Sequence, residues 1–295
     1  HHAHPERLEP DFAVLAPIKW LVVMIKDAMH HTVDTATCHK IHFRFFMIPV
    51  PDRLDMLTGG GAKYVAQLMD AGATTRDGML KWVTGIGSPF LSEGREMIMS
   101  EFGKDYANYL SILQLIAGGM TTQNQIDTII GKNTGTYLKN LDEDYSYVSK
   151  LHPLFSKPGG RNVKWCIEDC FLRFWFRFVL PNQALVEMER NDLLLEIILR
   201  DYNDYTGAVL EQYFRQKISE EDRVTRVGRY WDRKGLNEID IIALNEIDKT
   251  ALVAEVKRNA ARYDSRLLEQ KYQSIQSHFG GYKDVKLLGL SMADM

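Results

Sequence analysis

The stretch that decides the fold is "NEIDIIALNEIDKTALVAEVKRN", residues 237–259. It contains two aliphatic runs of strand length, separated by a short polar turn. Three charged side chains, Asp240, Glu255 and Lys257, interrupt these runs. Because side chains alternate between the two faces of a strand, Glu255 and Lys257 share one face. If the runs pair as a hairpin, Asp240 lies beside them. The stretch therefore predicts two neighbouring strands that carry a small charged cluster.

These residue types suit a divalent metal. Two carboxylates close together repel each other unless a positive charge lies between them, and Mg²⁺ binds through one or two carboxylates together with water and phosphate oxygens. A neighbouring lysine can orient the attacking water or stabilise the charge that builds on a phosphate. We therefore predict Asp240 and Glu255 as ligands of Mg²⁺, Lys257 as a catalytic residue, and Glu211 as a further carboxylate from the preceding helix. The alternative is a structural cluster that a Lys257 salt bridge neutralises.

The last ninety residues continue the alternation of strands and helices. "VTRVGRYWD" and "DVKLLGLS" are typical of strands, and "DSRLLEQKYQSIQSHF" is typical of a helix. Strongly aliphatic strands that alternate with helices predict a sheet covered on both faces, hence an α/β domain at 181–295. Before it, "MERNDLLLEIILRDYNDYTGAVLEQYFRQKI" predicts two helices, the second at about 205–217.

Residues 105–180 predict a smaller module. "DYANYLSILQLIAGG", "TTQNQIDTIIG" and "TGTYLKNLDEDY" have helical periodicity, and "YSYVSKLHPLF" and "NVKWCI" are strand-like on either side of the turn "SKPGGR". Three short helices and a hairpin make a winged helix-turn-helix, which often binds DNA through its third helix. Here the third helix ends in Asp142, Glu143 and Asp144, which repel phosphates. DNA contact and a packing or regulatory role both remain open for this module.

An aromatic stretch, "EDCFLRFWFRFVLPN", follows the predicted hairpin. It mixes five aromatic residues with Arg173 and Arg177, a combination that can stack on single-stranded bases. At this density the pattern favours a helix packed between two domains, ending at Pro181. Residues 57–104 are helical in pattern, and the glycines of "TGGGAKYVAQLMDAG" lack the spacing of a phosphate loop.

The bulk composition is that of an ordinary globular protein. Of the 295 residues, 45% are hydrophobic and 25% are charged, and the net charge of −3 gives no global basic field for nucleic acid. Cys38, Cys166 and Cys170 are too few and too irregular for a disulfide framework. No run of eighteen apolar residues occurs. We therefore expect a cytoplasmic protein with no membrane span.

The charged cluster resembles the motif of the PD-(D/E)xK nuclease superfamily. Asp240 matches the first metal-binding carboxylate of that superfamily, and Glu255 and Lys257 match its second carboxylate and its lysine. Glu211 matches the helical glutamate of many members. Ile239 stands where the motif has proline. The resemblance implies a restriction-endonuclease-like α/β fold for the C-terminal domain.

A longer resemblance begins at Leu57 and covers about 240 residues. "LTGGGAKYVAQLMDAGA", "YLSILQLIAGG", "LHPLFSKPGGRNVKWCIEDCFLRFWFRFV" and the 237–259 stretch resemble a prokaryotic AAA+-type ATPase family. The resemblance implies a remnant of a preceding domain at 1–56, a helical lid-like segment at 57–104, a winged helix with a linker helix at 105–180, and a nuclease-like domain at 181–295. The chain contains no GxxxxGK[ST] phosphate loop, so ATP is implied only for an N-terminal core.

Three functions follow from these two resemblances. The chain is part of an ATPase with a nucleic-acid-associated role, a Mg²⁺-dependent nuclease, or a non-catalytic interaction scaffold. Whether the chain itself is an enzyme depends on which of the three holds. The corresponding partners are DNA, another protein or a second copy of the chain.

Overall fold

The structure is a computed structural model that describes residues 62–73, 75–157 and 159–295. The chain forms two compact units, residues 1–79 and 80–295. The first contains helix α4 (Ala62–Asp70) and the start of helix α5 (Arg76–Val83). The expectation for residues 1–56 lies outside the described residues. The site belongs to the second unit, which is described below.

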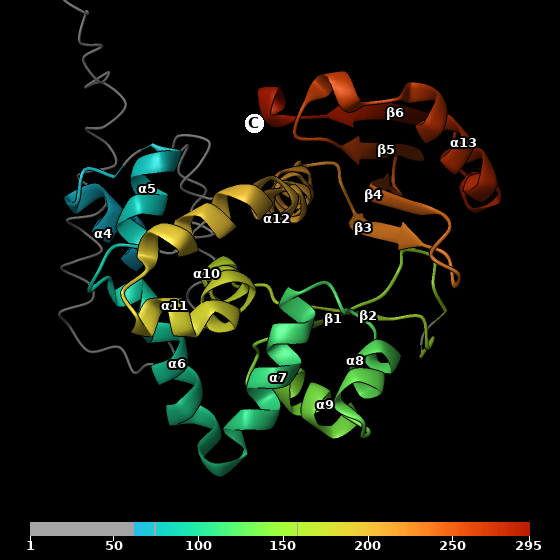
Figure 1. Cartoon of the computed structure of the whole chain (residues 1–295). Helices are drawn as coiled ribbons and strands as arrows, with labels where there is room; N and C mark the ends of the chain where they lie inside the picture. Colours follow the sequence, from blue (N-terminus) through green and yellow to red (C-terminus); the bar gives the residue numbers. More distant parts are fainter. Residues whose placement is uncertain (1–61, 74, 158) are drawn as a thin grey trace, which may run out of the picture. The chain divides into compact units, whose positions relative to one another are not determined.

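The second unit begins with helices. They are α6 (Pro89–Phe102), α7 (Tyr106–Ala117), α8 (Gln123–Ile130) and α9 (Gly135–Glu143), followed by the antiparallel strands β1 (Ser149–Leu151) and β2 (Lys164–Cys166). Figure 1 shows these elements in green, with the two short strands next to α7. Helices α7, α8 and α9 and the hairpin of β1 and β2 therefore occupy residues 105–180, the segment in which the sequence predicted three helices and a hairpin.

Local sequence explains the boundaries of α8. The backbone N–H of Thr122, at the start of the helix, donates a hydrogen bond of 3.1 Å to Oε1 of Gln125, as the capping-box spacing predicts. Gly131 follows the last turn with a φ of 77°, a left-handed conformation that suits glycine at the end of a helix. These signals fix where the helix begins and ends.

The aromatic stretch forms a buried and irregular helix. It consists of α10 (Cys170–Phe174), a π-helical turn (Trp175–Val179), a 3₁₀ turn (Leu180–Asn182) and α11 (Gln183–Glu187). Every residue from 170 to 179 except Arg177 is buried. Nε1 of Trp175 donates to the carbonyl of Leu91, at 3.1 Å. Because all five aromatic rings of the stretch are buried, they are not available to stack on bases.

One helix, not two, connects the aromatic stretch to the sheet. Helix α12 runs without interruption from Asn191 to Ser219, so the predicted break before residue 205 was wrong. Thr206 is buried and its hydroxyl donates to the carbonyl of Tyr202, at 2.8 Å. Gly207 follows it, and a single glycine without proline weakens a helix by only about 1 kcal/mol, which packing offsets.

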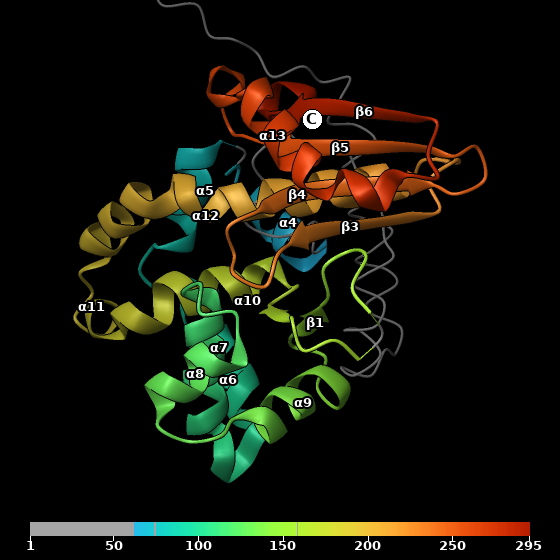
Figure 2. The same ribbon diagram turned by 90° about the vertical axis from the view of Figure 1, so that its right-hand side faces the viewer.

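The C-terminal part is built around a four-stranded sheet in the order β3-β4-β5-β6 (Figure 2). The strands are β3 (Arg226–Trp231), β4 (Glu238–Asn245), β5 (Thr250–Val256) and β6 (Asp284–Leu290). The first three are antiparallel neighbours, and β6 runs parallel to β5 after the crossover helix α13 (Ser265–Ile275). The order of helix and strands is the one predicted from the sequence.

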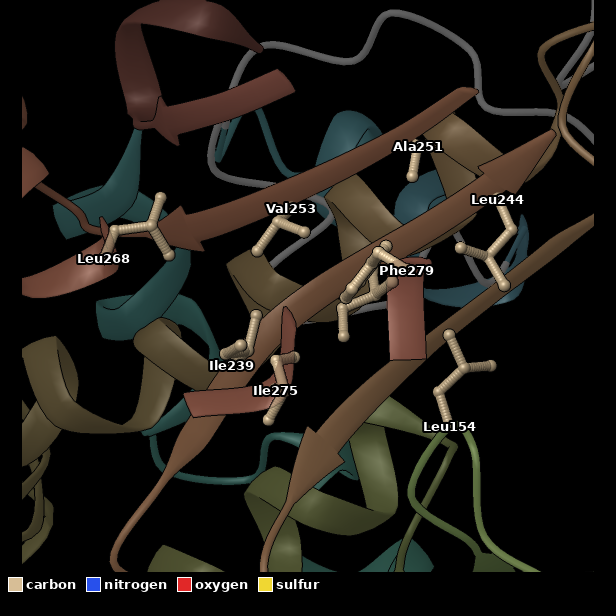
Figure 3. Close-up of a cluster of buried hydrophobic side chains, with 9 residues drawn as sticks. Leu154, Ile239, Leu244, Ala251, Val253, Leu268, Ile275 and Phe279 are labelled. Carbon is tan, nitrogen blue, oxygen red and sulfur yellow. The ribbon is translucent and has the colours of Figure 1, made fainter. Parts of the chain in front are cut away.

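Helices contact this sheet from both sides. Leu268 and Ile275 of α13 pack with Ile242, Leu244 and Val253 in one apolar cluster (Figure 3). The residues between these strand positions face the other way and are also buried; they are Ile241, Ala243 and Ala254. Helix α12 contacts β3, β4 and β5, and it covers this second face.

Strand β4 contains a β-bulge at the position of Asp240. Gly228 of β3 pairs with Ile242, but Tyr230, two residues on, pairs with Ile239, three residues back. The extra residue on β4 explains why Ile239 and Ile242, which are three apart, lie in the same apolar cluster. Strict alternation would direct Asp240 into that cluster with Ile242. Because of the bulge, the Asp240 carboxylate does not point into the apolar cluster.

The segment between β1 and β2, residues 152–163, is called the hairpin loop below. Its backbone N–H at Leu154 donates to the carbonyl of Arg229 on β3, at 2.7 Å. The Leu154 side chain lies in the sheet cluster (Figure 3), and the ring of Phe155 stacks on His278 with 4.7 Å between centroids. Asn162 Oδ1 accepts from Nε1 of Trp231, at 3.0 Å. The hairpin loop is therefore part of the sheet's packing.

In the described parts of the chain, no helix combines the length and the apolar character that a membrane crossing requires.

Candidate functional site

The predicted residues lie at one end of β4 and β5. The paired positions of these strands end at Ile241 and Ala254. Asp240 and Glu255 are the next residues along each strand, and Lys257 follows directly after β5. Glu211 comes from α12, on the face opposite to α13. The structure thus places three of the predicted residues on neighbouring strand ends and the fourth on the helix that covers them.

Asp240 is a buried carboxyl group with one backbone partner. Its side chain is 8% exposed, and Oδ2 accepts a hydrogen bond from the backbone N–H of Val256, at 2.8 Å. Burial raises the pKa of Asp240 to about 7, and the charges of Glu211 and Glu255 add to this effect. The Val256 N–H and the Lys257 ammonium act in the opposite direction. At neutral pH the group therefore exchanges between its protonated and charged forms.

Glu255 is buried between two lysines. Nζ of Lys257 lies 2.6 Å from Oε1, and Nζ of Lys271 on α13 lies 3.0 Å from Oε1 and 2.9 Å from Oε2. Burial lowers the pKa of Lys257, but the hydrogen bond to Glu255 and the charges of Glu255 and Asp240 outweigh it, and the net shift is upward. Lys257 is therefore an ammonium ion at neutral pH.

Glu211 is paired with arginines instead of lysines. Its Oε2 lies 3.0 Å from Nη2 of Arg229 and 3.7 Å from Nη1 of Arg215. Arg229 also donates to Oε1 of Glu238, at 3.1 Å, and Nζ of Lys164 binds the same carboxylate at 3.0 Å. The arginine cluster, defined as Arg215 and Arg229 with Glu211 and Glu238, thus adjoins Asp240 and extends toward β2.

The donor set allows one small cation. In the described residues, no group of three or more His, Cys, Asp and Glu side chains is arranged to hold a metal ion. A carboxylate offers about four lone-pair positions, of which the lysines occupy three on Glu255, so its Oε2 keeps one free. Burial first, and then the negative charges of Glu211 and Glu255, raise the pKa of Asp240, and a bound cation would favour its charged form. Asp240 and Glu255 therefore fit Mg²⁺ with two carboxylates and water.

Two groups of functional candidates were missed in the sequence. Lys271 is far from Glu255 in the chain, and only the crossover of α13 brings it close. Arg215 follows Glu211 by four residues on one helix, the spacing of an ion pair, and this signal was available. Arg229 gave no signal, because its approach to Asp240 depends on the bulge of β4.

The two described cysteines lie nearby and are not part of the cluster. Cys166 and Cys170 carry free thiols. Burial raises the pKa of Cys170 to about 12, and burial also raises the pKa of Cys166. Neither thiol is in the thiolate form that makes cysteine a nucleophile or a metal ligand.

Comparison with known proteins places this site in a region of recognisable similarity. Residues 175–278 match DUF234. That family is described as archaeal and bacterial proteins of unknown function. The matched region contains α12, β3, β4, β5 and α13, and so all four predicted site residues.

A curated relative extends the similarity beyond this region. An uncharacterized protein of Methanocaldococcus jannaschii is 30% identical over 211 residues, which cover 68% of this chain. The same alignment covers 45% of the relative, so the chain spans less than half the length of the relative it matches. No solved structure matches the chain. The similarity is therefore to prokaryotic proteins of unknown function.

Proposed function

We propose that the C-terminal domain is a nuclease-like phosphodiesterase that uses one Mg²⁺ ion, held by Asp240 and Glu255. The observation that carries the proposal is the buried Asp240 carboxyl at the β-bulge, next to Glu255. Burial raises the pKa of Asp240, the negative charges of Glu211 and Glu255 raise it further, and the positive charge of Lys257 is close enough to lower it. Strongly perturbed carboxyl groups of this kind are characteristic of functional sites.

The proposed chemistry divides the roles among three side chains. Asp240 and Glu255 hold the cation, which when bound lowers the pKa of a water ligand and polarises a phosphate oxygen. Lys257 stays protonated and stabilises the negative charge that builds on the phosphate. Lys271 fixes the orientation of Glu255 by binding both of its oxygens. Hydrolysis joins the water oxygen to phosphorus and breaks the bond to the leaving sugar oxygen.

A second candidate is a non-catalytic scaffold that keeps the nuclease-like fold. It is favoured by the two lysines on Glu255, which neutralise this carboxylate without a metal. In that case the cluster stabilises the junction of β5 and α13, and partners bind elsewhere. The two candidates differ in their response to Mg²⁺ and Mn²⁺, since only the first needs an ion.

The wider assignment rests on the resemblance to AAA+-type ATPases. In this proposal residues 105–180 form the winged helix, residues 57–104 belong to a lid, and ATP binds in an N-terminal core of the whole protein. The protein would act in the cytoplasm on DNA, or through a protein partner or self-association. Because the hairpin loop packs against the sheet, DNA would reach the module from the side of its helices.

The test is cleavage of single- and double-stranded DNA in the presence of Mg²⁺ or Mn²⁺. Asp240→Asn and Lys257→Met remove a ligand and a charge, and each should slow cleavage by about 10²–10³-fold. Asp284→Asn and Lys286→Met, two exposed positions on β6, are the matched controls and should cleave at the wild-type rate. Equal cleavage by all five proteins would refute the proposal. Inertness of all five would favour the scaffold.

A further inference from the structure

The arginine cluster beside Asp240 is incompletely bonded, and it is positively charged when Lys164, which binds Glu238, is counted with it. Three cationic side chains, Arg215, Arg229 and Lys164, surround two carboxylates, Glu211 and Glu238. One positive charge is therefore in excess, although the whole chain has a net charge of −3. The neighbouring Arg173 and Glu168 add one charge of each sign and leave this excess unchanged.

Arg215 is the least satisfied member of the cluster. Its side chain is 19% exposed, and its buried Nη1 makes no hydrogen bond with any described residue. Its ionic contact with Glu211 is long, with 3.7 Å between Nη1 and Oε2. Burial and the charge of Arg229 lower the pKa of Arg215. A buried guanidinium with unused donors costs free energy unless an acceptor binds them.

Arg229 has the same deficiency on the other side of Glu211. Its Nε is buried and has no hydrogen-bond partner among the described residues, and the same holds for Oε2 of Glu211, which lies between the two guanidinium groups. Its position on β3 lies across from the bulge that contains Asp240, between the pairs of Gly228 and Tyr230. Burial lowers the pKa of Arg229, but the negative charges of Glu211, Glu238 and Asp240 raise it, and the net shift is upward. Asp240 is therefore close enough to Arg229 to influence its charge.

Two guanidinium groups with free donors match one class of ligand. The planar fork of arginine binds a tetrahedral oxyanion, phosphate above all, through two parallel hydrogen bonds. We propose that Arg215 and Arg229 bind a phosphate group of a nucleic-acid strand whose neighbouring phosphate lies at Asp240. This inference rests on the proposed function for the identity of the strand. The oxyanion site itself follows from the unsatisfied arginines alone.

Arg215→Gln is the decisive variant, because it removes the free donors and leaves Arg229 to pair with Glu211. Arg266→Gln, at an exposed position of α13, is the matched control, and Arg215→Lys keeps the charge without the fork. Binding is measured in metal-free buffer, with inorganic phosphate by calorimetry and with a fluorescein-labelled single-stranded oligonucleotide by anisotropy. Arg215→Gln should weaken both by about tenfold or more, and Arg215→Lys by less.

Thermal unfolding separates binding from a structural role. In phosphate-free buffer Arg215→Gln should be at least as stable as the wild type, and phosphate should raise the melting temperature of the wild type but not that of Arg215→Gln. A lower melting temperature in Arg215→Gln, with unchanged phosphate binding, would assign Arg215 to structure and overturn the inference. Phosphate binding without oligonucleotide binding would overturn the nucleic-acid assignment.

The same measurements keep this inference separate from the proposed function. If Asp240→Asn abolishes cleavage but Arg215→Gln binds the oligonucleotide like the wild type, the oxyanion site is refuted and the proposed function stands. If the wild type does not cleave DNA but its phosphate and oligonucleotide binding requires Arg215, the metal centre is refuted and the oxyanion site is supported.

Discussion

The backbone N–H of Val256 points at the carboxylate of Asp240, with 2.8 Å between N and Oδ2. The backbone pairing of β4 and β5 ends at Ile241 and Ala254, so this side chain takes the place of a backbone acceptor. Asp240 thereby extends the sheet by one hydrogen bond. The bond fixes where the carboxylate lies, and it leaves Oδ1 for a ligand.

The raised pKa of Asp240 predicts how stability depends on pH. The folded state holds the proton up to a pKa of about 7, against 3.8 for an exposed aspartate, as in the unfolded chain. The stabilising contribution is complete below the unfolded value and is lost as pH rises through the folded one. Between about pH 4 and pH 7 the wild type should therefore lose stability relative to Asp240→Asn, and above about pH 7 the difference should stay constant, as urea unfolding in metal-free buffer would measure.

The control for this experiment is Asp284→Asn, which changes an exposed aspartate on β6. It should follow the wild type at every pH, because an exposed carboxyl has nearly the same pKa in both states. Parallel pH curves for Asp240→Asn and the wild type would contradict the prediction.

Mn²⁺ should stabilise the wild type above pH 7. The ion supplies the positive charge that the ionised Asp240 lacks, and saturation at about 100 times the dissociation constant gives about 2.7 kcal/mol. The effect should vanish in Asp240→Asn and in Glu255→Gln, and it should persist in Asp284→Asn. Thermal unfolding with and without the ion measures it. A full effect in Asp240→Asn would place the ion elsewhere.

Leu154→Ala should destabilise the C-terminal sheet even though residue 154 belongs to the hairpin loop. The side chain is 9% exposed and packs with the cluster shown in Figure 3. Removing a buried leucine side chain costs about 2–5 kcal/mol. Leu236→Ala is the control, since Leu236 is 81% exposed and should change stability by less than about 0.5 kcal/mol. Equal unfolding midpoints in urea would show that the loop does not pack as described.

Two glycine substitutions in helices should have opposite signs. A Cβ at Gly94 of α6 would lie 2.3 Å from Cδ2 of Trp175, so Gly94→Ala forces a buried ring to move and should cost about 1–3 kcal/mol or more. At Gly207 of α12 nothing lies within 4 Å of the added Cβ, and Gly207→Ala should gain about 0.5–1 kcal/mol. Chemical denaturation measures both. A stabilised Gly94→Ala protein would contradict the packing of Trp175.

Periodicity predicted the order of helices and strands in residues 105–295, because apolar faces repeat in both kinds of element. It failed at α12, which was predicted as two helices, the second at about 205–217, and which is one helix from Asn191 to Ser219. It also gave no sign of the bulge at Asp240, since an extra residue in one strand shows only against its partner.

Part of the candidate site could be predicted from the spacing of residues along one strand. Glu255 and Lys257 are two residues apart on one strand, so strand geometry alone brings them together. The partners that set the charge of the site, Lys271 and Arg229, come from other elements and depend on tertiary contacts. Their roles required the structure.

The hairpin loop couples the module of helices α7–α9 to the sheet, because it binds β3 at Arg229, whose side chain pairs with Glu211. The Leu154 N–H binds the carbonyl of Arg229, and the Arg229 side chain binds Glu211 and Glu238. A displacement of helices α7–α9 would therefore reach β3 through the hairpin loop at Arg229, which lies across from the bulge that contains Asp240, and at Trp231, which binds Asn162.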